Sequence, residues 1–167
     1  FTDGAFDLTI APLTRLWNIP DSKTPPDEGA IAAMLAFSGT SGIKFNDADR
    51  SVTFESFGGF DVGGIAKGFA GNFAADALKK AGCADGVLSL GGNVIVWGEK
   101  PDGSDFTVAI KNPLSSEHTS EYLGEIKCKD ACIVTSGTYG RYFEYEGKRY
   151  HHIIDPSTGY PADTDVL

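Results

Sequence analysis

The spacing of apolar residues predicts two main helices. Residues 27–39 combine an acidic first turn, apolar positions at helical spacing and a closing Gly39, which is typical of a short helix. Residues 60–82 predict a second helix that ends at Gly82, the usual position for a glycine after the last turn. In this second segment the apolar residues at helical spacing are Ile65, Phe69, Phe73, Ala77 and Leu78.

The remaining pattern predicts short strands. Residues 6–19 indicate an extended entry or strand that runs into a short helix, with Pro12 near its first turn. Residues 43–54 predict a hairpin around a polar turn. Short strands with turns between them are expected at residues 86–92, 93–99, 105–113, 122–128, 132–137, 141–147 and 148–156. This order favours an α+β fold with a mostly antiparallel sheet and few helices.

The length and composition are typical of one folded domain. The chain has 167 residues, of which 41% are hydrophobic and 22% charged, and we expect residues 1–167 to form a single domain. The chain opens at Phe1 without a methionine, so we expect it to be a fragment of a longer chain. Its location in the cell therefore cannot be read from a targeting segment.

The net charge narrows the class of partner. At −9 the chain would repel a nucleic-acid backbone over most of its surface, so we expect no nucleic-acid partner. A phosphate-bearing ligand remains compatible with this charge if backbone N–H groups and a metal ion carry the binding.

The stretch "DVGGIAKG", residues 61–68, is a candidate anion site. Two glycines at a helix start expose backbone N–H groups, and Lys67 in the first turn is easier to explain if an anion lies beside it. The alternative is a tight turn into the helix with close packing at Gly63 and Gly64, and the residues alone do not decide between the two. The pattern is neither a dinucleotide fingerprint nor a P-loop.

The stretch "RYHHIID", residues 149–155, contains the candidate catalytic group. Alternation along a strand places His151 and His152 on opposite faces, so one imidazole can face a site while the other does not. A structural, hydrogen-bonded histidine is the simpler interpretation, and a general acid or base near neutral pH is the other. Asp155 is expected to accept a hydrogen bond from a backbone N–H two residues on in the following turn.

Taken together, the motifs resemble one family. The stretches "GAFDLTIAPLTRLW", "DVGGIAKGFA", "LSLGGNV", "VTSGTYGRYF" and "HHIIDPSTGYPA" follow one another through essentially the whole chain. In this order they are similar to the FAD:protein FMN transferases, also called ApbE-type flavin transferases. The resemblance implies an α+β fold with T-fold-like halves.

The resemblance also implies an activity. Family members transfer FMN from FAD to a Thr or Ser hydroxyl of a target protein and release AMP, with the assistance of Mg²⁺. Many are exported, as periplasmic proteins or lipoproteins, and modify subunits of membrane redox complexes. We therefore expect FAD and such an acceptor protein as partners. An FAD-binding module, or an FAD pyrophosphatase that releases FMN and AMP without protein transfer, is the alternative.

The resemblance also implies roles for individual residues that match the family motifs. His152, directly before Ile-Ile-Asp-Pro, matches the catalytic histidine, which takes the proton of the acceptor hydroxyl. The Gly64 position supplies a main-chain carbonyl to the metal. The residues that match FAD contacts are Ala5, Phe6, Asp7, Asp61, Lys67 and Ile154.

The chain departs from the family at both ends. A segment with a methionine that contacts FAD should precede "GAFD", and a segment with the carboxylate and hydroxyl ligands of the metal should follow "GYPA". Gly64 alone cannot hold Mg²⁺, which prefers six oxygen donors. We therefore expect the remaining metal ligands to lie outside these 167 residues.

Overall fold

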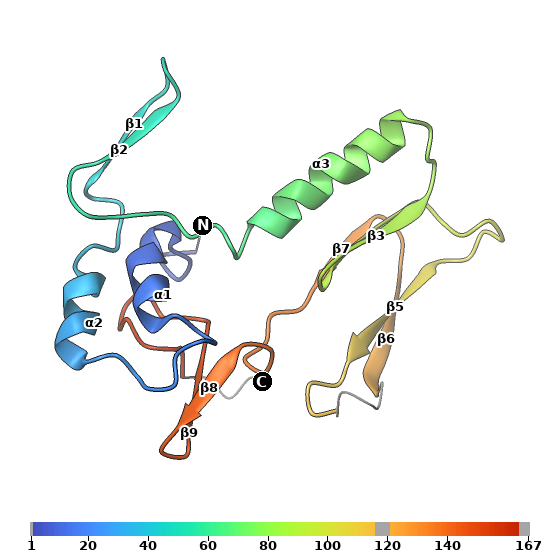
Figure 1. The fold of residues 1–167 in the computed structure, drawn as a ribbon. Coiled ribbons are helices and arrows are strands. Elements are labelled where there is room, and N and C mark those ends of the chain that lie inside the picture. The colour runs from blue at the N-terminus through green and yellow to red at the C-terminus, as the bar shows by residue number, and fades with distance from the viewer. Residues whose placement is uncertain (1, 116–120, 164–167) are drawn as a thin grey trace. The chain divides into compact units, whose positions relative to one another are not determined.

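The chain divides into two compact units. A computed structural model describes residues 2–115 and 121–163 (Figure 1). One unit contains Phe1–Val62 with Thr138–Leu167, and the other contains Gly63–Gly137. Every strand pairing in the described ranges is antiparallel, which confirms the predicted α+β class with mostly antiparallel sheets.

The first unit begins with a 3-10 turn rather than with the extended entry or strand predicted at the start of residues 6–19. The short helix predicted after it, with Pro12 near its first turn, is confirmed. The 3-10 helix η1 spans Leu8–Ile10 and leads directly into α1, Ala11–Trp17. The Asp7 carboxylate caps η1, because its Oδ1 accepts hydrogen bonds from the Thr9 backbone N–H at 2.8 Å and the Thr9 hydroxyl at 2.7 Å. This local hydrogen bonding competes successfully with an extended backbone.

The second helix of this unit confirms the prediction at narrower bounds. Helix α2 spans Glu28–Leu35, and Asp27 caps it by accepting from the backbone N–H of Gly29 at 2.9 Å. Gly39 lies beyond the helix with φ at +101°, a backbone conformation that favours glycine.

Two hairpins complete the first unit, one at the predicted hairpin of residues 43–54 and one at the two strands predicted for residues 141–147 and 148–156. Strand β1 (Ile43–Asn46) pairs with β2 (Ser51–Phe54), and β8 (Tyr142–Tyr145) pairs with β9 (Lys148–His151). The turn between β8 and β9 has positive φ at both central residues, Glu146 and Gly147, as a tight two-residue hairpin requires.

The core of the first unit is centred on Trp17. Its side chain is 0% exposed, and its ring stacks on that of Tyr150 at a centroid distance of 5.6 Å. The indole Nε1–H donates to the carbonyl of Gly159 at 2.8 Å, so the buried polar atom is satisfied. The other buried members of this cluster are Leu13, Ile31, Phe143 and Ile154.

The second unit packs one helix against a small sheet (Figure 1). The helix is α3 (Ala66–Lys80), and the strands are β3 (Gly86–Leu90), β4 (Asn93–Trp97), β5 (Phe106–Lys111), β6 (Tyr122–Cys128) and β7 (Ala131–Val134). The sheet has the strand order β3-β4-β7, and β5 and β6 form a separate two-stranded ribbon. These bounds confirm the predicted helix and strands. No helix in the described ranges is long and apolar enough to span a bilayer.

The buried side of α3 is made of small residues. Gly71 and Ala75 are its buried positions, and a Cβ on Gly71 would lie 2.4 Å from Cδ1 of Ile95 in β4. Phe69 and Phe73 sit at the predicted helical spacing but are 67% and 65% exposed. The spacing therefore identified the helix without identifying the face that packs on the sheet.

The turn after β9 is closed by Asp155. Its Oδ1 accepts from the Ser157 hydroxyl at 2.7 Å and from the Ser157 backbone N–H at 2.8 Å, which confirms the predicted bond two residues on. The hydroxyl bond is the larger of these two influences, and both hold the pKa of the Asp155 carboxyl below its ordinary value of 3.8.

We predict a pH-dependent contribution of Asp155 to stability. Because the folded state lowers its pKa, the carboxylate stabilises the fold above the unfolded-state pKa, and this stabilisation is lost as the pH falls through the folded-state pKa. The difference in free energy of unfolding between wild type and Asp155→Ala should be largest near neutral pH and should shrink below pH 3.8. Urea denaturation across pH measures it, with Asp155→Asn as the uncharged control. A difference that stays constant down to strong acid contradicts the prediction.

We also predict that Gly159→Ala destabilises the protein more than Gly147→Ala. Both glycines have φ at +78°, so both substitutions carry the same backbone strain of about 1 kcal/mol. At Gly159 the new methyl would also lie 2.9 Å from Cγ2 of Ile31, whereas at Gly147 it would meet nothing within 4 Å. The overlap should add about 1–3 kcal/mol in a urea titration. Equal costs would show that the docking of this turn is loose.

Candidate functional site

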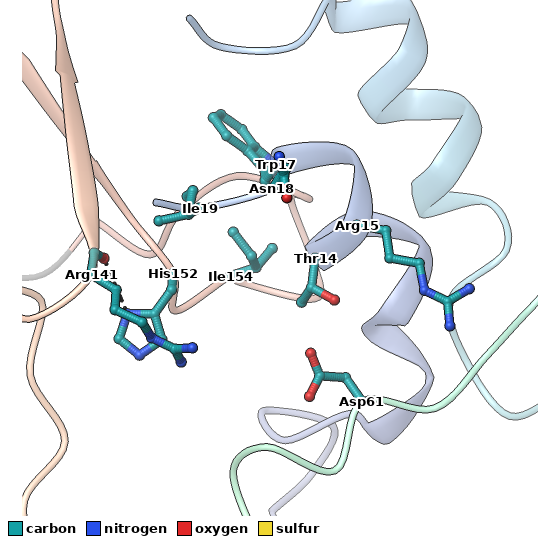
Figure 2. Close-up of a pocket in the computed structure, with 9 residues that line it drawn as sticks. All are labelled: Thr14, Arg15, Trp17, Asn18, Ile19, Asp61, Arg141, His152 and Ile154. Carbon is teal, nitrogen blue, oxygen red and sulfur yellow. Dashed lines mark hydrogen bonds between the residues drawn. The ribbon is translucent and has the colours of Figure 1, made fainter. Parts of the chain in front are cut away.

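A cleft in the first unit brings together part of the predicted site. It has a volume of about 270 Å³ and includes the predicted residues Asp61, His152 and Ile154 (Figure 2). The other lining residues were not predicted: Thr14, Arg15, Trp17, Asn18, Ile19 and Arg141. The cleft therefore lies where α1, the segment before α3 and the end of the β8–β9 hairpin meet.

His152 is held by the backbone of Arg141. The Arg141 carbonyl accepts from the His152 backbone N–H at 3.2 Å and lies 3.3 Å from its Nδ1. A carbonyl oxygen can only accept, so Nδ1 carries the proton in this contact. In the neutral imidazole the lone pair then belongs to Nε2, which is the tautomer of a base acting through Nε2.

His151 has the opposite arrangement. It is buried, its Nε2 lies 2.9 Å from the Ala162 carbonyl, and its Nδ1 accepts from the Ile153 backbone N–H at 3.3 Å. Nε2 is therefore the protonated nitrogen, and both ring nitrogens are used in holding the chain. His151 fits the structural interpretation of a histidine, and His152 lines the cleft.

Asp61 is held at the cleft by a backbone hydrogen bond to η1. Its backbone N–H donates to the Leu8 carbonyl at 2.8 Å, which fixes the segment before α3 against η1. Figure 2 shows the Asp61 carboxylate on one side of the cleft and the Arg141 and His152 side chains on the other. The lining holds two guanidinium groups, from Arg15 and Arg141, and one carboxylate, so it is locally cationic in a chain of net charge −9.

Ile154 both lines the cleft and belongs to the core. It is 8% exposed, packs in the cluster around Trp17, and forms an isolated antiparallel bridge with Pro161. Only part of its surface can therefore contact a ligand. Its position depends on the turn from Asp155 to Gly159, which closes directly after it.

The residues of the "GAFD" segment lie in the same unit outside the cleft lining. Ala5 is exposed, Phe6 is 44% exposed, and Asp7 is partly buried with one carboxylate oxygen engaged by Thr9. The predicted FAD contacts of these residues stay predictions. Asp7 has a local structural role in addition to any role in binding.

Gly64 and Lys67 belong to the second unit. Helix α3 begins at Ala66, so Gly63 and Gly64 form a turn before the helix rather than its first residues. Lys67 lies in the first helical turn as predicted, and its Nζ donates to the Gly91 carbonyl at 3.1 Å. This bond satisfies part of the ammonium group without any anion. Gly91 and Gly92 have positive φ and form the tight turn between β3 and β4.

The described residues do not fit a complete Mg²⁺ site. Gly64 is an exposed turn residue with only a main-chain carbonyl to offer, whereas Mg²⁺ prefers an octahedral set of oxygens. Within residues 2–115 and 121–163, His, Cys, Asp and Glu form no group of three or more that could hold a metal ion.

Arg141 is the functional candidate that the sequence reasoning missed. Arg141 was predicted only as the first residue of a strand at 141–147, and in the structure it directly precedes β8. The hairpin register indicates its position. Because Tyr142 pairs with His151, Arg141 and His152 face each other one residue beyond the ends of the two strands. Extending the hairpin by one residue would therefore have placed Arg141 beside His152.

We predict that the two histidines differ in their effect on stability. His151→Ala removes a buried ring with two hydrogen bonds and should cost about 1–3 kcal/mol in free energy of unfolding. His152→Ala should cost less than about 1 kcal/mol, because its ring is only partly buried at the edge of the cleft. Urea denaturation of both variants measures this, and a cost at His152 as large as that at His151 would contradict the assignment.

Curated relatives of this chain carry a transferase name. A "FAD:protein FMN transferase" of Klebsiella pneumoniae is 36% identical over 166 residues, which cover 98% of this chain and 50% of that protein. One from Vibrio cholerae is 32% identical over 169 residues, covering 99% of this chain and 50% of that protein. The chain thus spans about half the length of the curated relatives it matches.

Solved structures agree with these matches. The ApbE protein of Thermotoga maritima has a TM-score of 0.86 at 34% identity, over 96% of this chain and 52% of that chain. The flavinyl transferase ApbE of Pseudomonas stutzeri has a TM-score of 0.78 at 30% identity, over 97% and 50%. The sequence profile of the ApbE family matches residues 1–167. The resemblance inferred from the motifs is therefore confirmed, and the chain belongs to the ApbE family.

Proposed function

We propose that the protein transfers FMN from FAD to a Thr or Ser hydroxyl of a target protein and releases AMP. The curated relatives named FAD:protein FMN transferase support a flavin substrate and a protein acceptor. The observation that carries the proposal is the position of His152, which lines a cationic cleft with its Nδ1 3.3 Å from the Arg141 carbonyl.

The proposed step is a displacement at the phosphorus of the FMN half. His152 Nε2 accepts the proton of the acceptor hydroxyl as the hydroxyl oxygen attacks that phosphorus. The new phosphoester bond forms, the bond from that phosphorus to the bridging oxygen breaks, and AMP leaves with the bonding electrons. The proton on His152 then passes to solvent. Holding the two reactants in line is the larger part of the catalytic task.

We propose that the reaction depends on Mg²⁺, and this part of the proposal rests only on the family resemblance. The metal, when bound, would neutralise charge on the pyrophosphate. Gly64 is the residue of this chain proposed to give it a main-chain carbonyl, and the other ligands would come from outside these 167 residues. We also propose FAD contacts for Ala5, Phe6, Asp7, Asp61, Lys67 and Ile154, on their match to family motifs.

The acceptor and the place of action follow from the same resemblance. We propose an exported enzyme whose acceptor is a subunit of a membrane redox complex. The charge of −9 supports a partner other than nucleic acid.

Hydrolysis of FAD is the second candidate function. The His152 ring is only partly buried, so water can reach it and replace the acceptor hydroxyl as the nucleophile. The products would then be free FMN and AMP rather than a flavinylated protein. The same cleft supports both reactions, and the products distinguish them.

We predict that His152→Ala lowers the rate of FMN transfer by roughly 10²–10⁴-fold, the usual contribution of a general base. The full-length protein is incubated with FAD, Mg²⁺ and a Thr-containing acceptor, and the FMN-sized mass gain of the acceptor is followed by mass spectrometry. Glu144→Gln, on the same hairpin but outside the cleft lining, is the matched control and should keep the wild-type rate.

A His152→Ala protein that transfers FMN at the wild-type rate would remove His152 from the mechanism. Chromatography of the small-molecule products separates the two candidate functions. Free FMN with no flavin on the acceptor supports hydrolysis, and AMP with a modified acceptor supports transfer. FAD bound without any product would leave only a flavin-binding module.

A further inference from the structure

We propose that the Arg141 guanidinium binds the phosphates of the flavin substrate beside His152. This inference deepens the proposed function and rests on it. It assigns the phosphate end of the substrate to the side of the cleft formed by the β8–β9 hairpin, and it makes Arg141 a residue that touches the substrate rather than a loop residue before a strand.

The hairpin register places the two side chains together. Tyr142 of β8 pairs with His151 of β9, and the backbone N–H of His152 donates to the Arg141 carbonyl at 3.2 Å, so the ladder continues one step beyond the strands. Residues directly opposite each other in an antiparallel pair project from the same face, with Cβ atoms about 4.5–5.5 Å apart. Both side chains line the cleft, as Figure 2 shows.

The same ladder explains why this face leads into the cleft. Phe143 and Tyr150 are the next pair two positions along each strand, and their rings stack at 5.2 Å against the core around Trp17. Alternation puts Arg141 and His152 on that same face of the hairpin. Arg141 and His152 therefore follow Phe143 and Tyr150 on the same face of the hairpin. At this point Trp17 and Ile154 also line the cleft.

The other cations of the hairpin have partners within the protein. Arg149 pairs with Glu144 at 3.4 Å and lies 4.2 Å over the Tyr142 ring, and Lys148 lies 5.5 Å from the Tyr150 centroid. In the part of the chain that the structure describes, Arg141 forms none of the ion pairs. Its guanidinium group is thus available to an anionic ligand in a way that Arg149 is not.

The charges of the cleft also orient the ligand. The Asp61 carboxylate lies across the cleft from Arg141, so it repels phosphate and favours neutral hydroxyl or N–H groups. Arg15 is the other cation of the lining, but its guanidinium lies beside Gly59 and points away from the Arg141 side in Figure 2. A flavin dinucleotide should therefore place its diphosphate at Arg141 and His152 and a neutral part at Asp61.

The chemistry of the guanidinium suits the proposed reaction. Its planar fork of N–H donors matches two oxygens of a phosphate and remains charged at any working pH. As the acceptor oxygen bonds to phosphorus and the bridging oxygen departs, Arg141 would donate to the non-bridging oxygens while His152 holds the proton. A residue with this function should affect ligands that carry phosphate and leave unaffected those that lack it.

The test compares FAD with riboflavin, which has the same ring system and no phosphate. Binding of each to the full-length protein is followed by flavin fluorescence, and inorganic pyrophosphate serves as a third probe by calorimetry. Arg141→Ala should weaken FAD and pyrophosphate binding by roughly 10- to 100-fold and change riboflavin binding less than about two-fold. Arg141→Lys should fall between. Arg149→Ala, the matched control, should bind all three as wild type does.

Each outcome decides the inference. If Arg141→Ala binds FAD with wild-type affinity, the inference about Arg141 is wrong and the proposed function is unaffected. An equal loss of FAD and riboflavin affinity also overturns the inference, because it indicates a structural role for Arg141. A wild-type protein that binds pyrophosphate through Arg141 but transfers no FMN keeps the anion site and overturns the proposed function. A wild-type protein that binds neither FAD nor pyrophosphate overturns both. Circular dichroism of Arg141→Ala and of Arg141→Lys checks that both variants are folded.

Discussion

The position of the candidate site depends on the buried indole of Trp17. Its Nε1–H bond to the Gly159 carbonyl, at 2.8 Å, joins α1 to the turn that follows β9, and its ring packs on Tyr150 of β9 itself. A buried N–H without this acceptor would cost free energy, so helix, hairpin and turn hold one arrangement. His152 and Ile154 lie between β9 and that turn, so the same contact fixes the wall of the cleft.

Two adjacent histidines acquire different roles because successive side chains along the hairpin project from opposite faces. His151 closes strand β9 and uses both ring nitrogens on backbone groups, whereas His152 lies one step beyond, opposite Arg141. The backbone carbonyl of Arg141 selects the His152 tautomer, and its side chain adds positive charge to the same wall. One residue of the hairpin thus contributes to both the proton chemistry and the electrostatics of the cleft.

Features of the fold that depend on local sequence were predictable, and features that depend on contacts between distant residues were not. The turns at Gly91-Gly92 and Glu146-Gly147 were predictable because few residues adopt positive φ, and they fixed the hairpins. The start of residues 6–19 was not predictable, because Asp7 closes a 3-10 turn that periodicity does not reveal, whereas the short helix that follows was predicted. His152, Asp61 and Ile154 came from the family motifs, whereas Arg141 required the register of a folded hairpin. The buried face of α3 required the contact between Gly71 and Ile95.

We propose that a flavin dinucleotide occupies the cleft between Asp61 and the Arg141–His152 pair. Hydrogen exchange of the full-length protein, measured by mass spectrometry with and without FAD, locates the ligand most directly. FAD bound in this cleft should slow exchange in residues 59–62 and 139–154, which border the cleft, and change exchange in the β5–β6 ribbon little. Protection of the ribbon, with unchanged exchange on both sides of the cleft, would contradict this proposal.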